Sequence, residues 1–293
     1  MSNKNLFSAG NLFMGSKTKL DTCKVGIFGV NYDGTTSFKP GARFGPNAIR
    51  HVSDSLETYC PFLKRDLNLI DYFDAGSVNI ELNNSQSVLK KVTLATTFLI
   101  KNNLKPLVLG GEHSITIGVI EALVEKYPNL IILQLDAHAD LRKSYQNNKY
   151  SHACTISRCL EIIPSQTVFQ IGIRSGTKEE FQIMESSNQL IKFNTGDSTT
   201  HIEKILAQYK DNPIYLTLDL DWFDPSLLPG TGTPEPGGFF WHDFENIIKV
   251  LKSFNIIGCD IVELAPDIDV SGVSSIVAAK AARSLIMTLD NHM

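Results

Sequence analysis

Short apolar runs alternate with segments of helical periodicity along almost the whole chain of 293 residues. The runs at 106–109, 130–135, 214–218 and 256–262 have the length and aliphatic composition of buried strands. Between such runs apolar side chains recur at helical spacing, as in 85–100, where the lysines stand off the apolar face. Strands that alternate with helices form a parallel sheet covered by helices on both sides. The sequence therefore predicts an α/β fold, a three-layer α/β/α sandwich with a mostly parallel sheet.

The remaining elements follow the same alternation. We expect further strands at 23–30, 67–72, 168–173 and 191–193, and further helices at 46–50, 114–127, 155–162, 178–186, 200–209, 242–254 and 273–289. Ser114 is the candidate N-cap of its helix. Because no repeat, low-complexity tract or composition break marks a second domain, we expect a single domain over 1–293, with 1–20 as an N-terminal extension.

The amino-acid composition and net charge argue against several classes of function. With 43% hydrophobic and 20% charged residues the chain is an ordinary globular protein, and its net charge of −4 without a Lys/Arg run argues against a nucleic-acid partner. The five cysteines include no Cys-x-x-Cys pair, which is typical of free thiols in a reducing compartment. No signal peptide and no membrane span is recognisable. We expect a cytoplasmic protein without a membrane partner, and a small cationic substrate suits its charge.

Three metal-type side chains follow the run at 130–135. Asp136, His138 and Asp140 occupy alternate positions, so an extended backbone would direct them the same way. Three ionisable groups are costly to desolvate together unless a cation neutralises them. This spacing therefore predicts a metal site.

Two other predicted strands also end in metal-type side chains. His113 follows the Gly110-Gly111 pair, which lets the backbone approach closely, and Asp219 and Asp221 follow the strand at 214–218. The carboxyl ends of parallel strands meet at one edge of the sheet. Two imidazoles and four carboxylates suit two ions that share bridging carboxylates at about 3.5–4 Å, with a shared water acidified to hydroxide near neutral pH. An oxygen and nitrogen set without thiolate favours Mn²⁺, with Zn²⁺, Fe²⁺ or Co²⁺ as alternatives.

Each of these features has a structural alternative when it stands alone. A histidine at a helix start can simply bond to backbone, and an isolated Asp-x-Asp is often a turn or a helix cap. Their joint occurrence at three successive strand ends favours a binuclear hydrolase centre.

Three motifs resemble, in order, the metal signatures of the ureohydrolases, the family of arginase and agmatinase. They are Gly-Gly-Glu-His-Ser at 110–114, Asp-Ala-His-Ala-Asp at 136–140 and Asp-Leu-Asp-Trp-Phe-Asp-Pro at 219–225. The resemblance spans nearly the whole chain, from 38–46 through 229–238 to 260–263. It implies an arginase-like fold for a single ureohydrolase catalytic domain that forms a homotrimer or homohexamer.

The resemblance also implies roles for individual residues. His113 and Asp140 would bind one Mn²⁺, His138 and Asp221 the other, and Asp136 and Asp219 would bridge the two. Asp140 would also orient the nucleophile, Glu263 would bind the substrate guanidinium, and His152 would be the proton shuttle. Asp224 fits a loop-fixing role, the loop 229–238 would shape the pocket wall, and Trp222 is bulkier than the residue expected at its position.

Within the family, the loop 141–151 lacks the segment by which arginases hold an α-carboxylate and α-amine, and it resembles agmatinases. The expected reaction is hydrolysis of agmatine to putrescine and urea. Guanidinobutyrate, arginine and formimidoylglutamate remain alternative substrates, and the carboxylate of guanidinobutyrate would need a cation such as Arg142 or Lys143. An inactive regulatory subunit should lack a metal ligand, yet all six are present, and a metal-storage protein would not need Glu263 or His152.

Overall fold

The computed structural model describes residues 6–17, 19–81, 84–164, 167–187, 190–193 and 199–290. Within these residues the main sheet has nine strands in the order β1-β5-β2-β6-β11-β10-β7-β8-β9. Neighbouring strands pair in parallel throughout, except that β1 pairs antiparallel with β5. The prediction of a mostly parallel sheet is confirmed.

The strands and helices of this fold have the following bounds. The main sheet contains β1 (Phe7–Ser8), β2 (Val25–Gly29), β5 (Tyr72–Val78), β6 (Lys105–Leu109), β7 (Ile131–Leu135), β8 (Val168–Ile171), β9 (Leu190–Phe193), β10 (Ile214–Asp219) and β11 (Ile256–Val262), and a separate hairpin contains β3 (Tyr59–Cys60) and β4 (Arg65–Asp66). The helices are α1 (Gly45–Ser53), α2 (Ser85–Lys101), α3 (Ile115–Val124), α4 (Thr155–Ile162), α5 (Lys178–Ser186), α6 (Thr199–Leu206), α7 (Trp241–Leu251) and α8 (Val273–Leu289).

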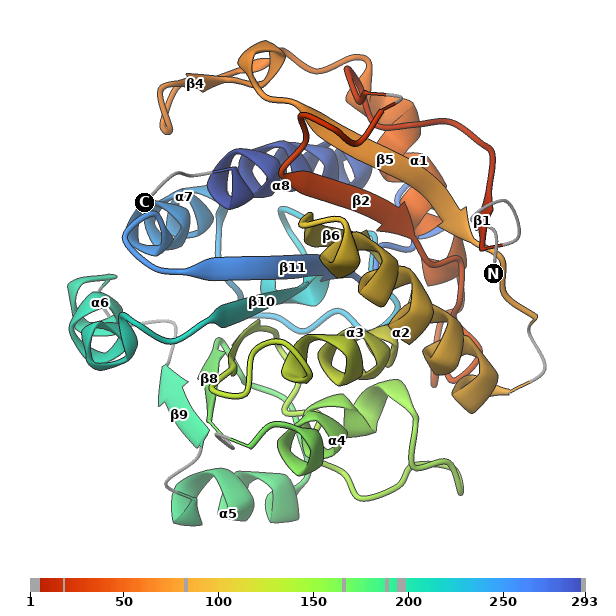
Figure 1. Ribbon diagram of the computed structural model, residues 1–293. Helices are drawn as coiled ribbons and strands as arrows, with labels where there is room; N and C mark the ends of the chain where they lie inside the picture. Colours follow the sequence, from red (N-terminus) through yellow and green to blue (C-terminus); the bar gives the residue numbers. More distant parts are fainter. Residues whose placement is uncertain are drawn as a thin grey trace.

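Two helical layers cover the sheet. Helices α1, α7 and α8 lie on one side, and α2, α3 and α4 pack together on the other (Figure 1). In β7, Ile131 and Leu133 point into the first layer and Ile132 into the second, because successive side chains of a strand face opposite sides. Burial on both sides explains why this strand is a continuous apolar run.

The strand predicted at 67–72 was wrong. Leu67–Leu69 is a 3₁₀ turn, and the strand that follows is β5 at Tyr72–Val78, which shares only Tyr72 with the predicted range. Asp74 is tolerated inside the sheet because Arg50 of α1 pairs with it, at 2.8 Å between Nη2 and Oδ1, with both side chains buried. Gly76 has a φ of +84°, and a Cβ there would lie 2.2 Å from the Ser8 carbonyl oxygen.

The predicted capping hydrogen bond of Ser114 at the start of α3 was also wrong. Ser114 occupies the N-cap position but makes no side-chain cap bond, because its hydroxyl donates to the buried Glu112 carboxylate. Other predicted helices agree with the structure within a few residues, and those at 155–162, 178–186 and 273–289 match it to the residue. In the part of the chain that the structure describes, none of the helices is long and apolar enough to cross a membrane.

Candidate metal centre

Four neighbouring strands at the middle of the sheet, β6, β11, β10 and β7, deliver side chains to one edge. His113 lies in the connection from β6 to α3, Glu263 directly follows β11, Asp219 ends β10, and Asp136 directly follows β7. Because all four strands are parallel, their carboxyl ends meet at this edge. Residues more than a hundred positions apart in the chain thereby become neighbours.

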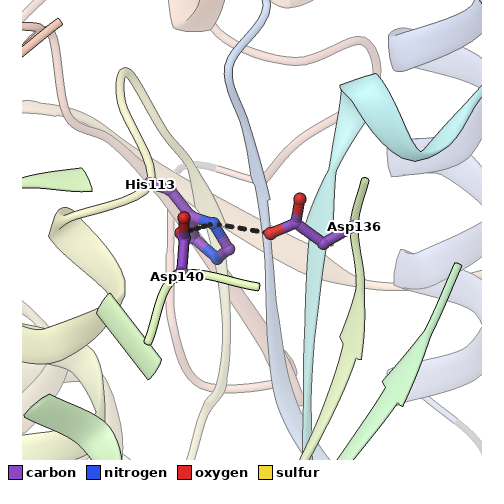
Figure 2. A group of neighbouring side chains, drawn as sticks. All are labelled: His113, Asp136 and Asp140. Carbon is purple, nitrogen blue, oxygen red and sulfur yellow. Dashed lines mark ion pairs between the residues drawn. The ribbon is translucent and has the colours of Figure 1, made fainter. Parts of the chain in front are cut away.

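The first cluster surrounds Nδ1 of His113. This nitrogen lies 3.0 Å from Oδ2 of Asp140, 3.1 Å from Oδ2 of Asp136 and 3.4 Å from Oδ2 of Asp219. Figure 2 shows the side chains of His113, Asp136 and Asp140 pointing toward one another, with His113 in the connection after β6 and both aspartates in the segment after β7. All of these side chains are buried, so their charges interact with little screening by water.

The second cluster surrounds Nδ1 of His138, which lies 2.8 Å from Oδ2 of Asp221 and 3.8 Å from Oδ1 of Asp136. Asp136 thus turns one oxygen to each histidine and belongs to both clusters. The second oxygen of Asp219 accepts the backbone N–H of Asp221 at 3.0 Å, so Asp219 belongs to the His113 cluster through its other oxygen, Oδ2. The six side chains singled out from the sequence lie together as two overlapping groups.

The segment after β7 is less regular than an extended chain. The strand ends at Leu135, and Asp140 has a φ of +53°, in the left-handed region that L-residues rarely adopt. Asp136 and His138 are further linked by a bond from the backbone N–H of His138 to Oδ1 of Asp136, at 2.6 Å. The three side chains therefore lie in two adjacent clusters and do not converge on one point: Asp140 is in the His113 cluster, His138 is in the second, and Asp136 is in both.

The tautomer of His113 follows from its outer contacts. Nε2 lies 2.8 Å from the Thr217 hydroxyl, and that hydroxyl donates to Oδ1 of Asp260 at 2.6 Å. Since the single hydroxyl hydrogen is used, Thr217 must accept from Nε2–H. Nδ1 is then the nitrogen that faces the three carboxylates, and it makes no hydrogen bond with any described residue. An imidazole whose other nitrogen is fixed as a donor can give up the proton on the nitrogen that faces the carboxylates and bind a cation there, so these residues fit a metal.

The electrostatics of the cluster point the same way. Burial lowers the pKa of His113, but the carboxylates of Asp136, Asp140 and Asp219 outweigh it and raise that pKa well above its ordinary value. Burial and the Asp221 charge raise the pKa of Asp136 to about 7. Without a cation, burial and the repulsion between Asp136 and Asp221 therefore favour a bound proton on Asp136. The donor atoms are carboxylate oxygens and imidazole nitrogens, which suit Mn²⁺ and other divalent transition metals.

Glu263 is held in place by an unusual backbone. Its φ of +66° is again left-handed, a conformation that costs of order 1–3 kcal/mol in a non-glycine residue. Its backbone N–H donates to the Gly111 carbonyl at 2.8 Å, and its Oε1 accepts the His113 N–H at 2.7 Å. A Cβ on Gly111 would lie 1.8 Å from the Tyr32 carbonyl oxygen, which explains why the chain has glycine there.

A cavity of about 190 Å³ opens onto both clusters. The side chains around it include His113, His138, Asp140, Asp219, Asp221, His152, Glu263, Arg142, Tyr145, Glu180, Ser37 and Thr233. His152 and Glu263, both predicted to act on substrate, therefore face the same space. Thr233 comes from the loop 229–238, so that loop contributes to the wall as predicted. Burial lowers the pKa of His152.

Two predictions about the flanking residues can be compared with the structure. Asp224 accepts the backbone N–H groups of Gly237 and Gly238, at 2.9 and 3.1 Å, so its loop-fixing role is confirmed. Trp222 is fully buried and stacks on Phe239 with 4.4 Å between ring centroids. A Cβ on Gly172 would lie 2.6 Å from this indole, so the absent side chain there makes room for the bulk of Trp222.

Arg174 was missed from the sequence. Its guanidinium donates to the carbonyls of Asp221 at 2.7 Å, Glu235 at 2.8 Å and Pro236 at 3.1 Å, and so ties the wall loop to a cluster residue. Its position shortly after β8 was the available signal, since that strand ends at the same edge of the sheet. Arginine donates in several directions at once, which suits it to hold irregular backbone.

Comparison with known proteins agrees with this geometry. The arginase family model matches residues 23–288. The agmatinase of Bacillus cereus is 38% identical over 282 residues, covering 95% of this chain and 96% of that protein, and the N(1)-aminopropylagmatine ureohydrolase of Thermococcus kodakarensis is 38% identical over 82% of each chain. A solved structure from Clostridium difficile has 41% identity and a TM-score of 0.88, covering 92% of this chain and 98% of that one.

These matches extend over most of the chain and include the sheet that carries the two clusters. They confirm the predicted fold class and the predicted class of hydrolase. This chain belongs to the arginase family and is a ureohydrolase most similar to agmatinases.

Proposed function

We propose that the protein hydrolyses agmatine to putrescine and urea at a binuclear metal centre. The observation that carries the proposal is the double role of Asp136, whose two oxygens face two histidines in two overlapping ligand groups. The similarity to proteins named agmatinase supports agmatine as the substrate.

The six clustered side chains would hold the metals in the proposed arrangement. His113 and Asp140 would hold one Mn²⁺, His138 and Asp221 would hold the other, and Asp136 and Asp219 would be shared between the two. When bound, such a pair lowers the pKa of a shared water toward neutrality and stabilises negative charge on the reacting centre. Manganese is favoured by the mixed oxygen and nitrogen ligands, and Zn²⁺, Fe²⁺ or Co²⁺ would fit the same donors.

Three protein side chains handle the substrate in this proposal. Glu263 lies at the cavity with its backbone held rigidly, and its carboxylate binds the guanidinium by charge-assisted hydrogen bonds. The left-handed backbone of Asp140 keeps its carboxylate at the centre, where it orients the attacking water. His152 delivers a proton to the leaving amine, and its lowered pKa favours release of that proton.

The cavity rim favours agmatine over a substrate with a carboxylate tail. Arg142 lines the cavity, but its guanidinium lies 3.5 Å from the Glu180 carboxylate and 4.6 Å from the centre of the Tyr145 ring. The charge of Arg142 is therefore already balanced by Glu180, which also lines the cavity. Guanidinobutyrate would have to break this ion pair to gain Arg142 as the cation for its carboxylate.

Cellular location and assembly complete the proposal. All five cysteines lie among the described residues as buried free thiols, which supports a reducing, cytoplasmic location. A homotrimer or homohexamer is proposed from the family resemblance, and sedimentation of the purified protein would test it.

The test is product release from Mn²⁺-loaded protein. Urea should be measured with agmatine, N(1)-aminopropylagmatine, arginine and guanidinobutyrate, and formamide with formimidoylglutamate. We expect the highest kcat/KM with agmatine. His152→Ala should reduce turnover by about 100-fold or more while the metal content stays the same. A protein that binds two metals and yet releases nothing from any of the five compounds would refute the proposed function.

A further inference from the structure

The loop after β2 packs its polar side chains against His152. Thr35 makes the closest contacts: its Oγ1 accepts the backbone N–H of His152 at 3.0 Å and lies 3.3 Å from Nδ1 of the ring. On the other side of the imidazole, the Ser37 hydroxyl lies 3.3 Å from Nε2 and lines the cavity. The ring is thus held between two hydroxyl groups of one loop.

Thr35 is in turn anchored by Glu112, which is fully buried. The Thr35 hydroxyl donates to Oε1 of Glu112 at 2.6 Å, and the Thr35 backbone N–H donates to Oε2, also at 2.6 Å. The Ser114 hydroxyl donates to the same carboxylate. With both oxygens accepting, Glu112 directs the single hydrogen of the Thr35 hydroxyl away from His152.

Because the Thr35 hydroxyl donates its hydrogen to Glu112, it determines which nitrogen of the neutral His152 ring carries the hydrogen. Since Thr35 has no hydrogen left for Nδ1, the contact between them is attractive only if Nδ1 carries a hydrogen and donates it. The Ser151 hydroxyl lies 3.3 Å from the same nitrogen and can accept from it as well. The neutral ring then has its lone pair on Nε2, the nitrogen toward Ser37 and the cavity. A proton taken up or released at the cavity therefore travels through Nε2.

We propose that Thr35, anchored by Glu112, is a positioning residue that holds His152 as the Nδ1–H tautomer with Nε2 toward the substrate. The inference rests on the proposed proton transfer by His152 and adds the residues that prepare it. It gives a function to the loop 35–41 and to the glutamate of the Gly-Gly-Glu-His-Ser motif. A fixed tautomer and ring orientation keep the transferring atom aligned with the leaving amine.

Two substitutions at Thr35 separate the effect of its hydroxyl group from the effect of its side-chain shape. Thr35→Val keeps the branched side chain but removes the hydroxyl, and we expect kcat with agmatine to fall by about 10-fold or more with little change in KM. Thr35→Ser keeps the hydroxyl and should restore most of the turnover. Thr36→Val is the matched control, because the Thr36 hydroxyl donates to the Asp33 carbonyl and not to His152. Equal losses in Thr35→Val and Thr36→Val, at equal metal content, would overturn the proposal.

A double mutant shows whether Thr35 acts through His152. In the His152→Ala background, Thr35→Val should have no further effect on kcat, because the group that it positions is gone. Full additivity of the two losses would overturn the positioning role while leaving the proton-transfer role intact. If His152→Ala alone left turnover unchanged, the proton-transfer role itself would fail.

The tautomer can also be measured without an assay of activity. In ¹⁵N-histidine-labelled, Zn²⁺-loaded protein, which is diamagnetic, the ring signals of His152 are identified by their loss in His152→Ala. We expect a protonated Nδ1 and an unprotonated Nε2 in the neutral ring, and a mixture of tautomers in Thr35→Val. Protonation of Nε2 alone in the wild-type protein would overturn the proposal.

Discussion

The Thr217 hydroxyl lies 2.8 Å from Nε2 of His113 and accepts its hydrogen, because its own hydrogen goes to Asp260. A chain of hydrogen bonds that starts at a buried carboxylate thereby sets which histidine nitrogen faces the cluster. The same logic applies to Glu112, Thr35 and His152. In both places a threonine transmits the orientation, since one hydroxyl can donate in one direction and accept in another.

The first prediction concerns this bond. Thr217→Val should weaken Mn²⁺ binding by about 10–100-fold, because the histidine loses the partner that fixes its tautomer. The matched control is Thr116→Val: the Thr116 hydroxyl also donates to Asp260, at 2.7 Å, but the hydroxyl that contacts Nε2 of His113 belongs to Thr217. Calorimetric titration of the metal-free proteins measures both. The same loss of affinity in both variants would point to Asp260 rather than to the tautomer.

The second prediction concerns the shared carboxylate. Asp136→Asn leaves one acceptor oxygen where two face the histidines, so we expect loss of bound metal and of turnover. Asp219→Asn should have the same effect if it bridges as proposed. Asp211→Asn, at an exposed position, is the control. Metal content by mass spectrometry and urea release are the measurements, and two retained metals with full turnover in Asp136→Asn would disprove the bridging role.

The third prediction concerns pH. Burial lowers the pKa values of His113 and His138, but neighbouring carboxylates raise both well above the ordinary value, so the metal-free imidazoles hold protons at pH 7. Metal ligation requires neutral imidazole, so binding must release protons. Affinity should therefore increase as pH rises through these raised pKa values and then level off. Calorimetry in buffers of different ionisation enthalpy gives the proton count, and an affinity that is independent of pH from 6 to 9 would contradict the assignment.

The fourth prediction concerns Glu263. Glu263→Gln retains an oxygen that can accept the His113 N–H but removes the negative charge offered to a guanidinium. We expect kcat/KM with agmatine to fall by about 30-fold or more, since removing one partner of a buried charge pair costs at least about 2 kcal/mol. Steady-state kinetics and metal content measure the effect. Unchanged kcat/KM would exclude Glu263 as the guanidinium ligand.

The fifth prediction concerns the clamp made by Arg174. Arg174→Lys replaces a planar group that donates to several carbonyls with a single ammonium, so we expect a loss of about 2 kcal/mol in the free energy of unfolding. Arg158→Lys is the control, because Arg158 pairs with an exposed glutamate within α4. Urea denaturation gives both values. Equal stability of the two variants would mean that the carbonyl contacts of Arg174 contribute nothing.

Much of the fold and part of the candidate site follow from local patterns. The buried run that became β7 could be identified because a strand covered on both faces is apolar throughout. Asp136, His138 and Asp140 could be selected because they directly follow such a strand. β5 could not be found in this way, because Asp74 and Gly76 are residue types typical of turns. Their presence in a strand is explained only by the ion pair of Asp74 with Arg50 and by the close approach of the Ser8 backbone to Gly76.

The sequence by itself determined the layered α/β fold and the residue types at the carboxyl edge, because strand and helix periodicity depend on covalent geometry over a few residues. The tertiary structure alone decided which oxygen of Asp136 faces which histidine. It also decided how Thr35 and Thr217 set two imidazole tautomers, and it placed Asp140 and Glu263 in left-handed backbone conformations. These features depend on contacts between segments that are far apart in the chain, and such contacts exist only once the strands have paired.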